Sequence, residues 1–131
     1  MKIVADTSVI IAVIANEPEK AALVKITKGA ELIAPHSVNW EIGNAFSAML
    51  RRKKITIDEA SQALDAYAKI PIGFLDVELE LSLRIADQLG ILAYDAYILR
   101  CAQKYRSRLV SLDRYLVDRA RSLGIRIMEV C

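Results

Sequence analysis

Four acidic residues of this 131-residue sequence stand where a carboxylate could do chemistry, at the end of an apolar run or near the start of a helix. Asp6 and Asp113 each follow a short apolar run that predicts a strand, and each precedes a helical pattern. Glu41 lies in the first turns of one predicted helix, and Asp95 lies at the amino end of another. Each could instead serve only its helix, because Asp is a common N-cap residue and acids are favoured near helix amino ends.

A shared site for these carboxylates would indicate a divalent cation. Carboxylates in one site repel one another and raise their pKa values, and a cation removes that cost. Hard oxygen ligands favour Mg²⁺ or Mn²⁺. Asp95 lies in a stretch, residues 90–99, that is otherwise uncharged, so we expect it to be buried and to need a partner. The single histidine, His36, excludes a multi-histidine metal site, so carboxylates would carry the chemistry of an enzyme.

The elements that must position these acids alternate along the chain. Apolar runs predict strands at residues 2–5, 31–34, 71–77, 109–112 and 125–130. Three- and four-residue spacing, N-cap residues and glycine stops predict helices at residues 9–15, 18–28, 37–53, 56–69, 78–89, 114–123 and one that ends near residue 105. This alternation predicts an α/β fold with a mainly parallel sheet of about five strands, covered by helices on both faces. Asp6 and Asp113 should meet at the carboxyl edge of that sheet.

Length and composition predict a single domain over residues 1–131. No apolar run reaches the about 20 residues of a membrane helix, and the start lacks a signal peptide's basic region and cleavage site, so we expect a cytoplasmic protein without a membrane partner. Cys101 and Cys131 have neither the number nor the spacing of a disulfide framework or a zinc site. From Arg100 onward the chain carries eight Lys or Arg against three acids, which favours a polyanionic partner.

Four segments together resemble the PIN-domain ribonucleases, and within them the VapC-type toxins of toxin–antitoxin pairs: VADTSVII near the start, then EIGNAF, AYDAYILRCA and the late LVSLD. The resemblance spans essentially the whole chain, with the acids in the family's order. It implies a three-layer α/β/α PIN-like fold in which Asp6, Glu41, Asp95 and Asp113 gather around Mg²⁺ or Mn²⁺ and cleave RNA. Asp6 and Asp95 are then the expected direct ligands, with Glu41 and Asp113 positioning water or a second metal.

The resemblance also implies supporting residues and partners. Ser8 and Asn44 fall where the family often has supporting polar residues, and Ser111 keeps the hydroxyl of a threonine that many members have two residues before the last acid. Two residues after the last acid, some members have a further acid or Asn, whereas this chain has Tyr115. The implied partners are an RNA substrate such as tRNA or ribosomal RNA, a cognate antitoxin, and a second copy of the chain in a homodimer.

Other interpretations stay open at this point. A catalytically inert PIN-like module that binds RNA or a protein partner would keep the acids as helix caps. A phosphoacceptor receiver domain has a similar length and an acidic Mg²⁺ pocket, but it normally shows two adjacent acids after its first strand, where this chain has Ala5-Asp6-Thr7. A structure-specific nuclease acting on DNA or on ribosomal RNA precursors usually brings extra segments, for which this short chain has little room.

Overall fold

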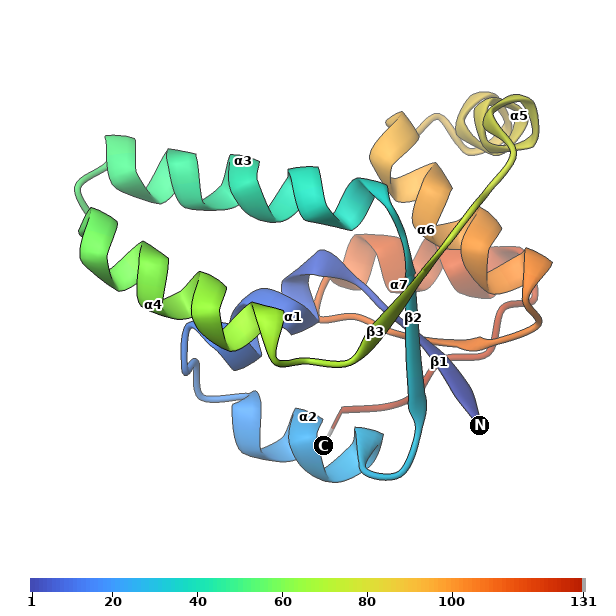
Figure 1. Cartoon of the computed structure of the whole chain (residues 1–131). Helices are drawn as coiled ribbons and strands as arrows, with labels where there is room; N and C mark the ends of the chain where they lie inside the picture. Colours follow the sequence, from blue (N-terminus) through green and yellow to red (C-terminus); the bar gives the residue numbers. More distant parts are fainter. Residues whose placement is uncertain (131) are drawn as a thin grey trace.

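Seven helices and four strands alternate along the chain in the computed structural model, which describes residues 1–130 (Figure 1). The strands are β1 (Lys2–Ala5), β2 (Glu31–Pro35), β3 (Ile72–Leu75) and β4 (Arg108–Val110). The helices are α1 (Thr7–Ile14), α2 (Lys20–Thr27), α3 (Ser37–Arg51), α4 (Ile57–Ala68), α5 (Leu79–Leu89), α6 (Ala93–Lys104) and α7 (Arg114–Ser122). The α/β alternation predicted from the sequence is confirmed.

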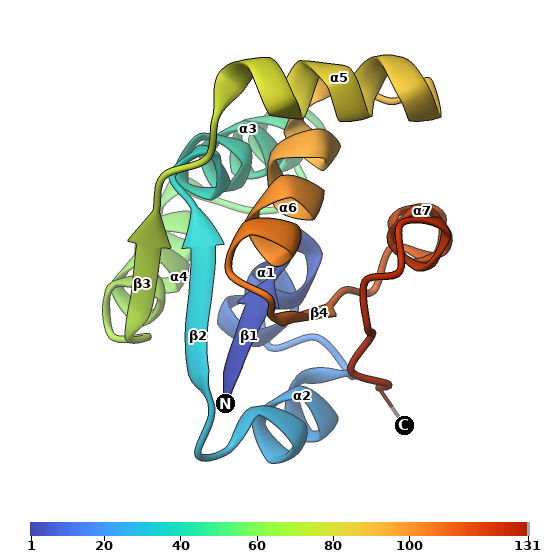
Figure 2. The ribbon, with the colours of Figure 1, turned by 90° about the vertical axis from the view of Figure 1, so that its right-hand side faces the viewer.

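The four strands form one parallel sheet in the order β3-β2-β1-β4 (Figure 2). Helices α1, α3 and α4 lie on one side of this sheet, and α5, α6 and α7 lie on the other, which makes three α/β/α layers (Figures 1 and 2). The central strand β1 buries Ile3, Val4 and Ala5 completely. An uninterrupted apolar run is what a strand covered on both faces requires, because neither face meets water.

The predicted fifth strand at residues 125–130 is wrong, because the described residues contain a sheet of four strands. Ile127 makes only a single parallel bridge to Leu109. Pairing cannot extend far along β4, which is three residues long. The Leu109 N–H donates to the Arg126 carbonyl at 2.9 Å and the Met128 N–H donates to the Leu109 carbonyl at 2.8 Å, so the segment touches β4 at one residue only, and beyond the bridge Glu129 forms an ion pair with Arg121 of α7.

Local signals explain where the helices begin and end. Thr56 and Glu59 form the predicted capping box at the start of α4. Helix α5 stops at Gly90, whose φ of 65° lies in the left-handed region that favours glycine. Helix α3 ends at Arg51, two residues before the predicted end, because Lys53 has a positive φ of 54° that a helix does not tolerate. No helix within residues 1–130 combines the length and hydropathy needed to span a membrane.

The carboxyl ends of β1 and β4 lie side by side. Ala5 pairs with Val110, and the Asp6 N–H donates to the Val110 carbonyl at 3.1 Å. The residues that follow these two strands therefore meet at one edge of the sheet, as predicted. Helix α6 packs against β1, β2 and α3, so the two helices that carry Glu41 and Asp95 are in contact although they cover opposite faces of the sheet.

Candidate metal centre

Asp6 occupies the N-cap position of α1 and is buried, but its side chain does not cap the helix. Its Oδ2 atom accepts hydrogen bonds from the Ser8 hydroxyl at 2.7 Å and from the Ser111 hydroxyl at 2.8 Å. Burial raises the pKa of Asp6, these hydroxyls lower it in part, and the charge of Asp113 raises it further. Helix capping alone therefore does not explain a buried acid at this position.

Two serine hydroxyls join the ends of β1 and β4 around Asp6. Ser8 Oγ accepts a hydrogen bond from the Leu112 N–H at 3.0 Å, and Ser111 Oγ accepts one from the Asp113 N–H at 3.0 Å. Each hydroxyl thus receives a backbone N–H and donates its own proton to the same carboxylate oxygen. This arrangement fixes the orientation of the Asp6 carboxylate. Both serines were predicted as supporting residues, and the structure places both in contact with Asp6.

Glu41 carries a carboxylate oxygen, Oε1, that is buried and has no hydrogen-bond partner, and the same holds for the Thr7 hydroxyl. Burial, followed by the charges of Asp6 and Asp95, raises the pKa of Glu41 to about 7. The Thr7 hydroxyl offsets part of this rise, although its geometry falls short of a hydrogen bond. A buried oxygen without a partner is costly, so Glu41 needs a proton or a cation. Thr7 was not predicted, and its only signal in the sequence is its place beside Asp6.

Asp95 and Asp113 differ in what their helices require of them. Asp95 is the third residue of α6, is half-buried, and is not the N-cap. Burial raises the pKa of Asp95, and the charges of Asp113 and Asp6 raise it further. Asp113 is exposed and caps α7, because its Oδ1 atom accepts from the N–H groups of Tyr115 at 3.0 Å and Leu116 at 3.3 Å. The capping interpretation is confirmed for Asp113.

The four predicted acids lie near one another, because the charge of Asp113 raises the pKa of Asp6, the charges of Asp6 and Asp95 raise that of Glu41, and the charges of Asp113 and Asp6 raise that of Asp95. Within residues 1–130, no group of three or more His, Cys, Asp or Glu side chains has the arrangement of a complete metal site. The residues nevertheless fit Mg²⁺ or Mn²⁺, because they are hard oxygen donors and one oxygen, Glu41 Oε1, is buried without a partner. Mg²⁺ needs only one or two carboxylates when water and phosphate supply the remaining ligands.

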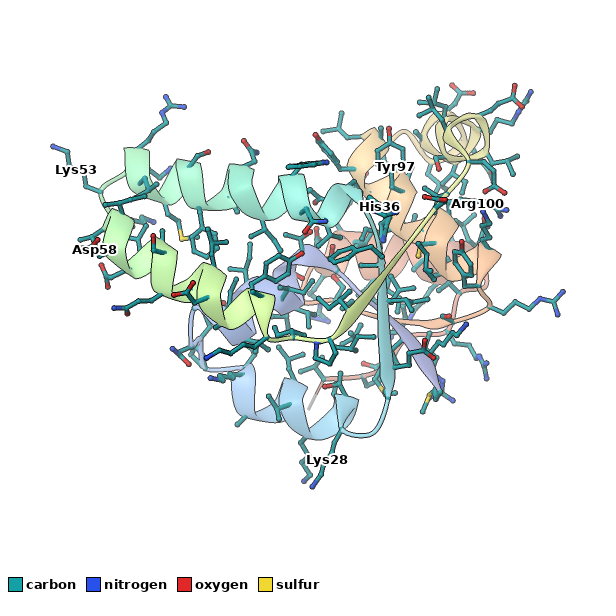
Figure 3. All side chains as sticks on the ribbon, in the orientation of Figure 1. Lys28, His36, Lys53, Asp58, Tyr97 and Arg100 are labelled. Carbon is teal, nitrogen blue, oxygen red and sulfur yellow. The ribbon has the colours of Figure 1, made fainter. Side chains whose placement is uncertain are left out.

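Two other polar residues lie apart from this cluster of acids. The His36 Nε2 atom lies 3.1 Å from Asp76 Oδ1, and the His36 ring stacks on that of Phe74, at the carboxyl ends of β2 and β3 (Figure 3). His36 therefore contacts neither Asp6, Glu41, Asp95 nor Asp113 through these interactions. Asn44 lies on the exposed side of α3, and within residues 1–130 its side chain makes no hydrogen bond to an acid. Its supporting role stays a prediction.

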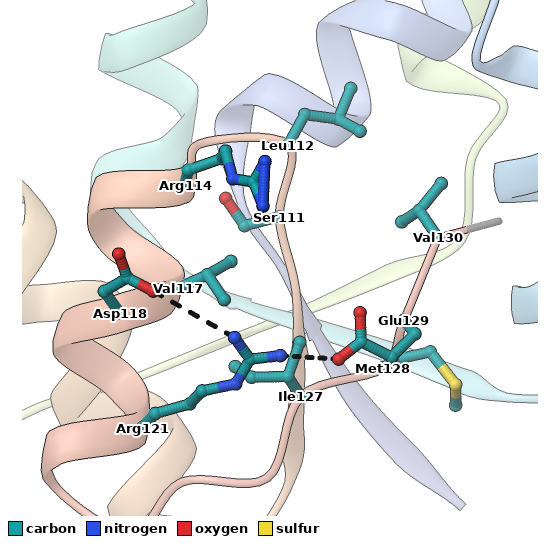
Figure 4. Close-up of a pocket in the computed structure, with 10 residues that line it drawn as sticks. All are labelled: Ser111, Leu112, Arg114, Val117, Asp118, Arg121, Ile127, Met128, Glu129 and Val130. Carbon is teal, nitrogen blue, oxygen red and sulfur yellow. Dashed lines mark hydrogen bonds and ion pairs between the residues drawn. The ribbon is translucent and has the colours of Figure 1, made fainter.

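A cavity of about 310 Å³ opens beside Ser111, between α7 and the segment after residue 124 (Figure 4). Arg114, the residue after Asp113, also lines it. On the far side of the cavity, Arg121 forms ion pairs with Asp118 at 4.0 Å and with Glu129. Arg114 forms no ion pair with another described residue. It lines the same cavity as Ser111, the serine that donates to Asp6.

A parallel α/β sheet with acids gathered at its carboxyl edge is the arrangement these observations define. The model of the PIN domain matches residues 3–122, and the chain therefore belongs to the PIN-domain family. PAE2754 from Pyrobaculum aerophilum has a similar fold, with a TM-score of 0.72 and 23% identity over 94% of this chain and 86% of that one. A second similar fold is found in the crystal structure of VapBC2 from Rickettsia felis bound to a DNA fragment from the VapBC2 promoter. One chain of that structure matches with a TM-score of 0.69 and 14% identity over 98% of both chains. No curated protein matches this chain significantly.

Proposed function

We propose that this protein is a divalent-metal-dependent endoribonuclease and the VapC-type toxin of a toxin–antitoxin pair. The observation that carries the proposal is the pair of Asp6 and Glu41. Both carboxylates are removed from water and repel each other, one is oriented by two hydroxyls, and the other has a buried oxygen without a partner. Such a pair costs stability unless a cation or a proton neutralises it. Membership of the PIN-domain family supports nuclease chemistry at this site.

The roles of the acids follow from their surroundings. A bound Mg²⁺ or Mn²⁺ would polarise a non-bridging phosphate oxygen and lower the pKa of a bound water. Asp6, held by its two hydroxyls, and Asp95 would be the direct ligands. Glu41, whose buried Oε1 atom has no hydrogen-bond partner in the structure, would accept a proton from the attacking water. Asp113 uses Oδ1 for capping and keeps Oδ2 to orient water. The products carry 5′-phosphate and 3′-hydroxyl ends, and 2′,3′-cyclic phosphate ends would reject this mechanism.

The proposed partners are an RNA such as tRNA or ribosomal RNA in the cytoplasm, a cognate antitoxin, and a second copy of the chain. The excess of basic residues from Arg100 onward supports a polyanionic substrate. The similarity in fold to a chain of VapBC2 supports an antitoxin. Light scattering on the purified chain tests the homodimer, and a monomer at high concentration would remove that part of the proposal.

Cleavage of total RNA and of purified tRNA by the full chain tests the main proposal. The protein is assayed with Mg²⁺, with Mn²⁺ and with EDTA, beside Asp6→Asn. Asp58→Asn is the matched control, because Asp58 is exposed near the start of α4, away from the acids (Figure 3). We expect metal-dependent cutting by the wild type and the control, and a loss of at least about a thousandfold in Asp6→Asn. Equal inactivity of all three folded proteins with every metal would favour an inert binding module.

A further inference from the structure

A second cavity, of about 520 Å³, lies at the end of β4 that is opposite to the acids. Arg106 and Ser107, which precede β4, line this cavity together with Arg126, whose carbonyl accepts from the Leu109 N–H at 2.9 Å. Asp113 follows the other end of the strand. Three residues of extended chain span about 10 Å, and none of the four acids lines the cavity, so it is separate from the candidate metal centre.

The described residues that line this cavity include three arginines and no acid. Arg100 of α6 is held in place by Glu78, because its Nε atom donates to Glu78 Oε1 at 2.9 Å (Figure 3). Within residues 1–130, the other two arginines, Arg106 and Arg126, form no ion pair. The positive charges of Arg106 and Arg126 are therefore not offset by an acid of the described chain.

The carboxyl ends of α6 and α7 meet at this cavity, but their carbonyls do not need the arginine side chains. At the end of α6, the Ser107 N–H donates to the Ala102 carbonyl at 3.0 Å. At the end of α7, the Ile125 N–H donates to the Ala120 carbonyl at 3.0 Å. The helix dipole favours basic residues only within the last turn of a helix, and Arg126 lies more than one turn beyond the last residue of α7.

Arg106 occupies a backbone position that favours glycine. It follows the C-cap residue of α6 as Gly124 follows the C-cap residue of α7, and the two φ angles are 50° and 75°. A side chain in the left-handed region is unfavourable, which is why glycine is common at this position. The local backbone therefore gives no reason for an arginine here, and the charge of Arg106 needs another explanation.

We propose that Arg100, Arg106 and Arg126 form a binding site for the phosphate groups of a small ligand, such as a nucleoside diphosphate. The planar guanidinium group binds phosphate oxygens in pairs, and Arg100 is already oriented by Glu78. The volume of the cavity lies within the range of about 300–1,000 Å³ that is typical of small-molecule sites. No acid of the metal centre takes part, so the inference does not rest on the proposed nuclease function.

The shape of this site favours a small ligand over a nucleic acid, which offers the same phosphate chemistry. Proteins bind single-stranded nucleic acids along a basic groove that follows the backbone over several nucleotides. The three arginines instead line one cavity. A ligand with one or two phosphate groups can contact all three guanidinium groups without a longer basic track.

Calorimetric titration of the full chain with inorganic diphosphate in EDTA tests the site. Without a metal, the clustered carboxylates repel an anion and cannot bind the probe. We expect saturable binding with a Kd below about 1 mM. The affinity should fall as NaCl rises from about 0.05 M to about 0.5 M, because salt screens the arginine charges. Absence of binding at about 1 mM diphosphate in low salt would overturn the proposal.

Substitutions assign the binding to the cavity. Arg106→Gly removes a guanidinium group and suits the left-handed backbone, and Arg126→Gln removes the second charge without an ion-pair partner. Each variant should bind diphosphate about tenfold more weakly, because a hydrogen bond to a charged group is lost. The matched control is the double variant Arg51→Gln and Arg52→Gln, which removes two exposed charges at the end of α3 and should keep the wild-type affinity. Circular dichroism and urea unfolding confirm that each variant is folded.

A short single-stranded RNA with hydroxyl ends, titrated in the same buffer, distinguishes a small ligand from a nucleic acid. We expect Arg106→Gly and Arg126→Gln to leave RNA affinity unchanged. Weaker RNA binding in both variants, with no binding of diphosphate to the wild type, would assign the cavity to a nucleic-acid backbone and refute the proposal. Equal weakening of diphosphate binding in the control would also refute it, since net charge alone would then explain the affinity. Cleavage is not measured in this assay, so either result leaves the nuclease proposal standing.

Discussion

Replacing Glu41 with Gln should stabilise the metal-free protein at alkaline pH while it removes activity. The pKa of this carboxyl rises from 4.5 to about 7 in the folded chain, chiefly because it is buried. Because the pKa is higher in the folded chain than in the unfolded chain, ionising Glu41 lowers the free energy of unfolding. This loss of stability is absent below about pH 4.5, where Glu41 is protonated in both the folded and the unfolded chain. It reaches its full size above about pH 7, where Glu41 is ionised in both. The amide keeps the shape of the side chain and never carries the charge.

The size of this effect follows from the shift and the burial. A rise from 4.5 to about 7 corresponds to about 3 kcal/mol at full effect. Glu41 is only partly buried, so solvent screening reduces the expected gain to about 1–2 kcal/mol. For a chain of 131 residues this gain raises Tm by about 4–8 °C.

Urea unfolding in EDTA between pH 5 and pH 8.5 measures this gain. The free energy of unfolding of the wild type should fall relative to that of Glu41→Gln as pH rises to about 7.5 and then run parallel to it. Mg²⁺ should stabilise the wild type more than the variant, because only the wild type has a Glu41 charge whose repulsion by Asp6 and Asp95 a cation would offset. Glu80→Gln, an exposed change on α5, should alter neither comparison. A Glu41→Gln advantage that is equal at pH 5 and pH 8 would refute the reasoning, since it could not come from a buried charge.

Other substitutions separate the structural and chemical roles of the site. Ser111→Ala removes a donor to Asp6, so it should cost about 1–2 kcal/mol in urea unfolding and weaken Mn²⁺ binding by about 10- to 100-fold in calorimetry. Asp113→Ser keeps a capping oxygen but loses the charge, so its stability should stay within about 0.5 kcal/mol of the wild type while RNA cleavage falls. Equal cleavage by Asp113→Ser and the wild type would limit Asp113 to capping. Thr56→Ala breaks the capping box with Glu59 and should cost about 1 kcal/mol without changing cleavage.

The sequence alone predicted the helices and four of the strands, together with the local place of each acid, but it wrongly predicted a fifth strand at residues 125–130. The capping box at Thr56 and Glu59 and the stop at Gly90 are signals carried by residues within a few positions of one another. The fully apolar run before Asp6 predicts a strand covered on both faces, and β1 is such a strand. Together these patterns were sufficient to predict a parallel α/β fold and a resemblance to PIN domains, and both are confirmed.

Only the tertiary structure decided what each acid does. Asp6 and Asp113 both occupy N-cap positions, yet Asp113 caps its helix while the Asp6 side chain does not. The Asp6 carboxylate instead accepts from Ser8, two residues away, and from Ser111, which lies 105 positions away in the chain and reaches it across the β1–β4 pairing. The raised pKa of Glu41 likewise depends on the tertiary structure, because it comes from burial and from the charges of Asp6 and Asp95, which belong to distant segments of the chain. Local patterns encode helices and strands, but strand order decides which distant side chains meet, and burial there decides which carboxylates resist ionisation.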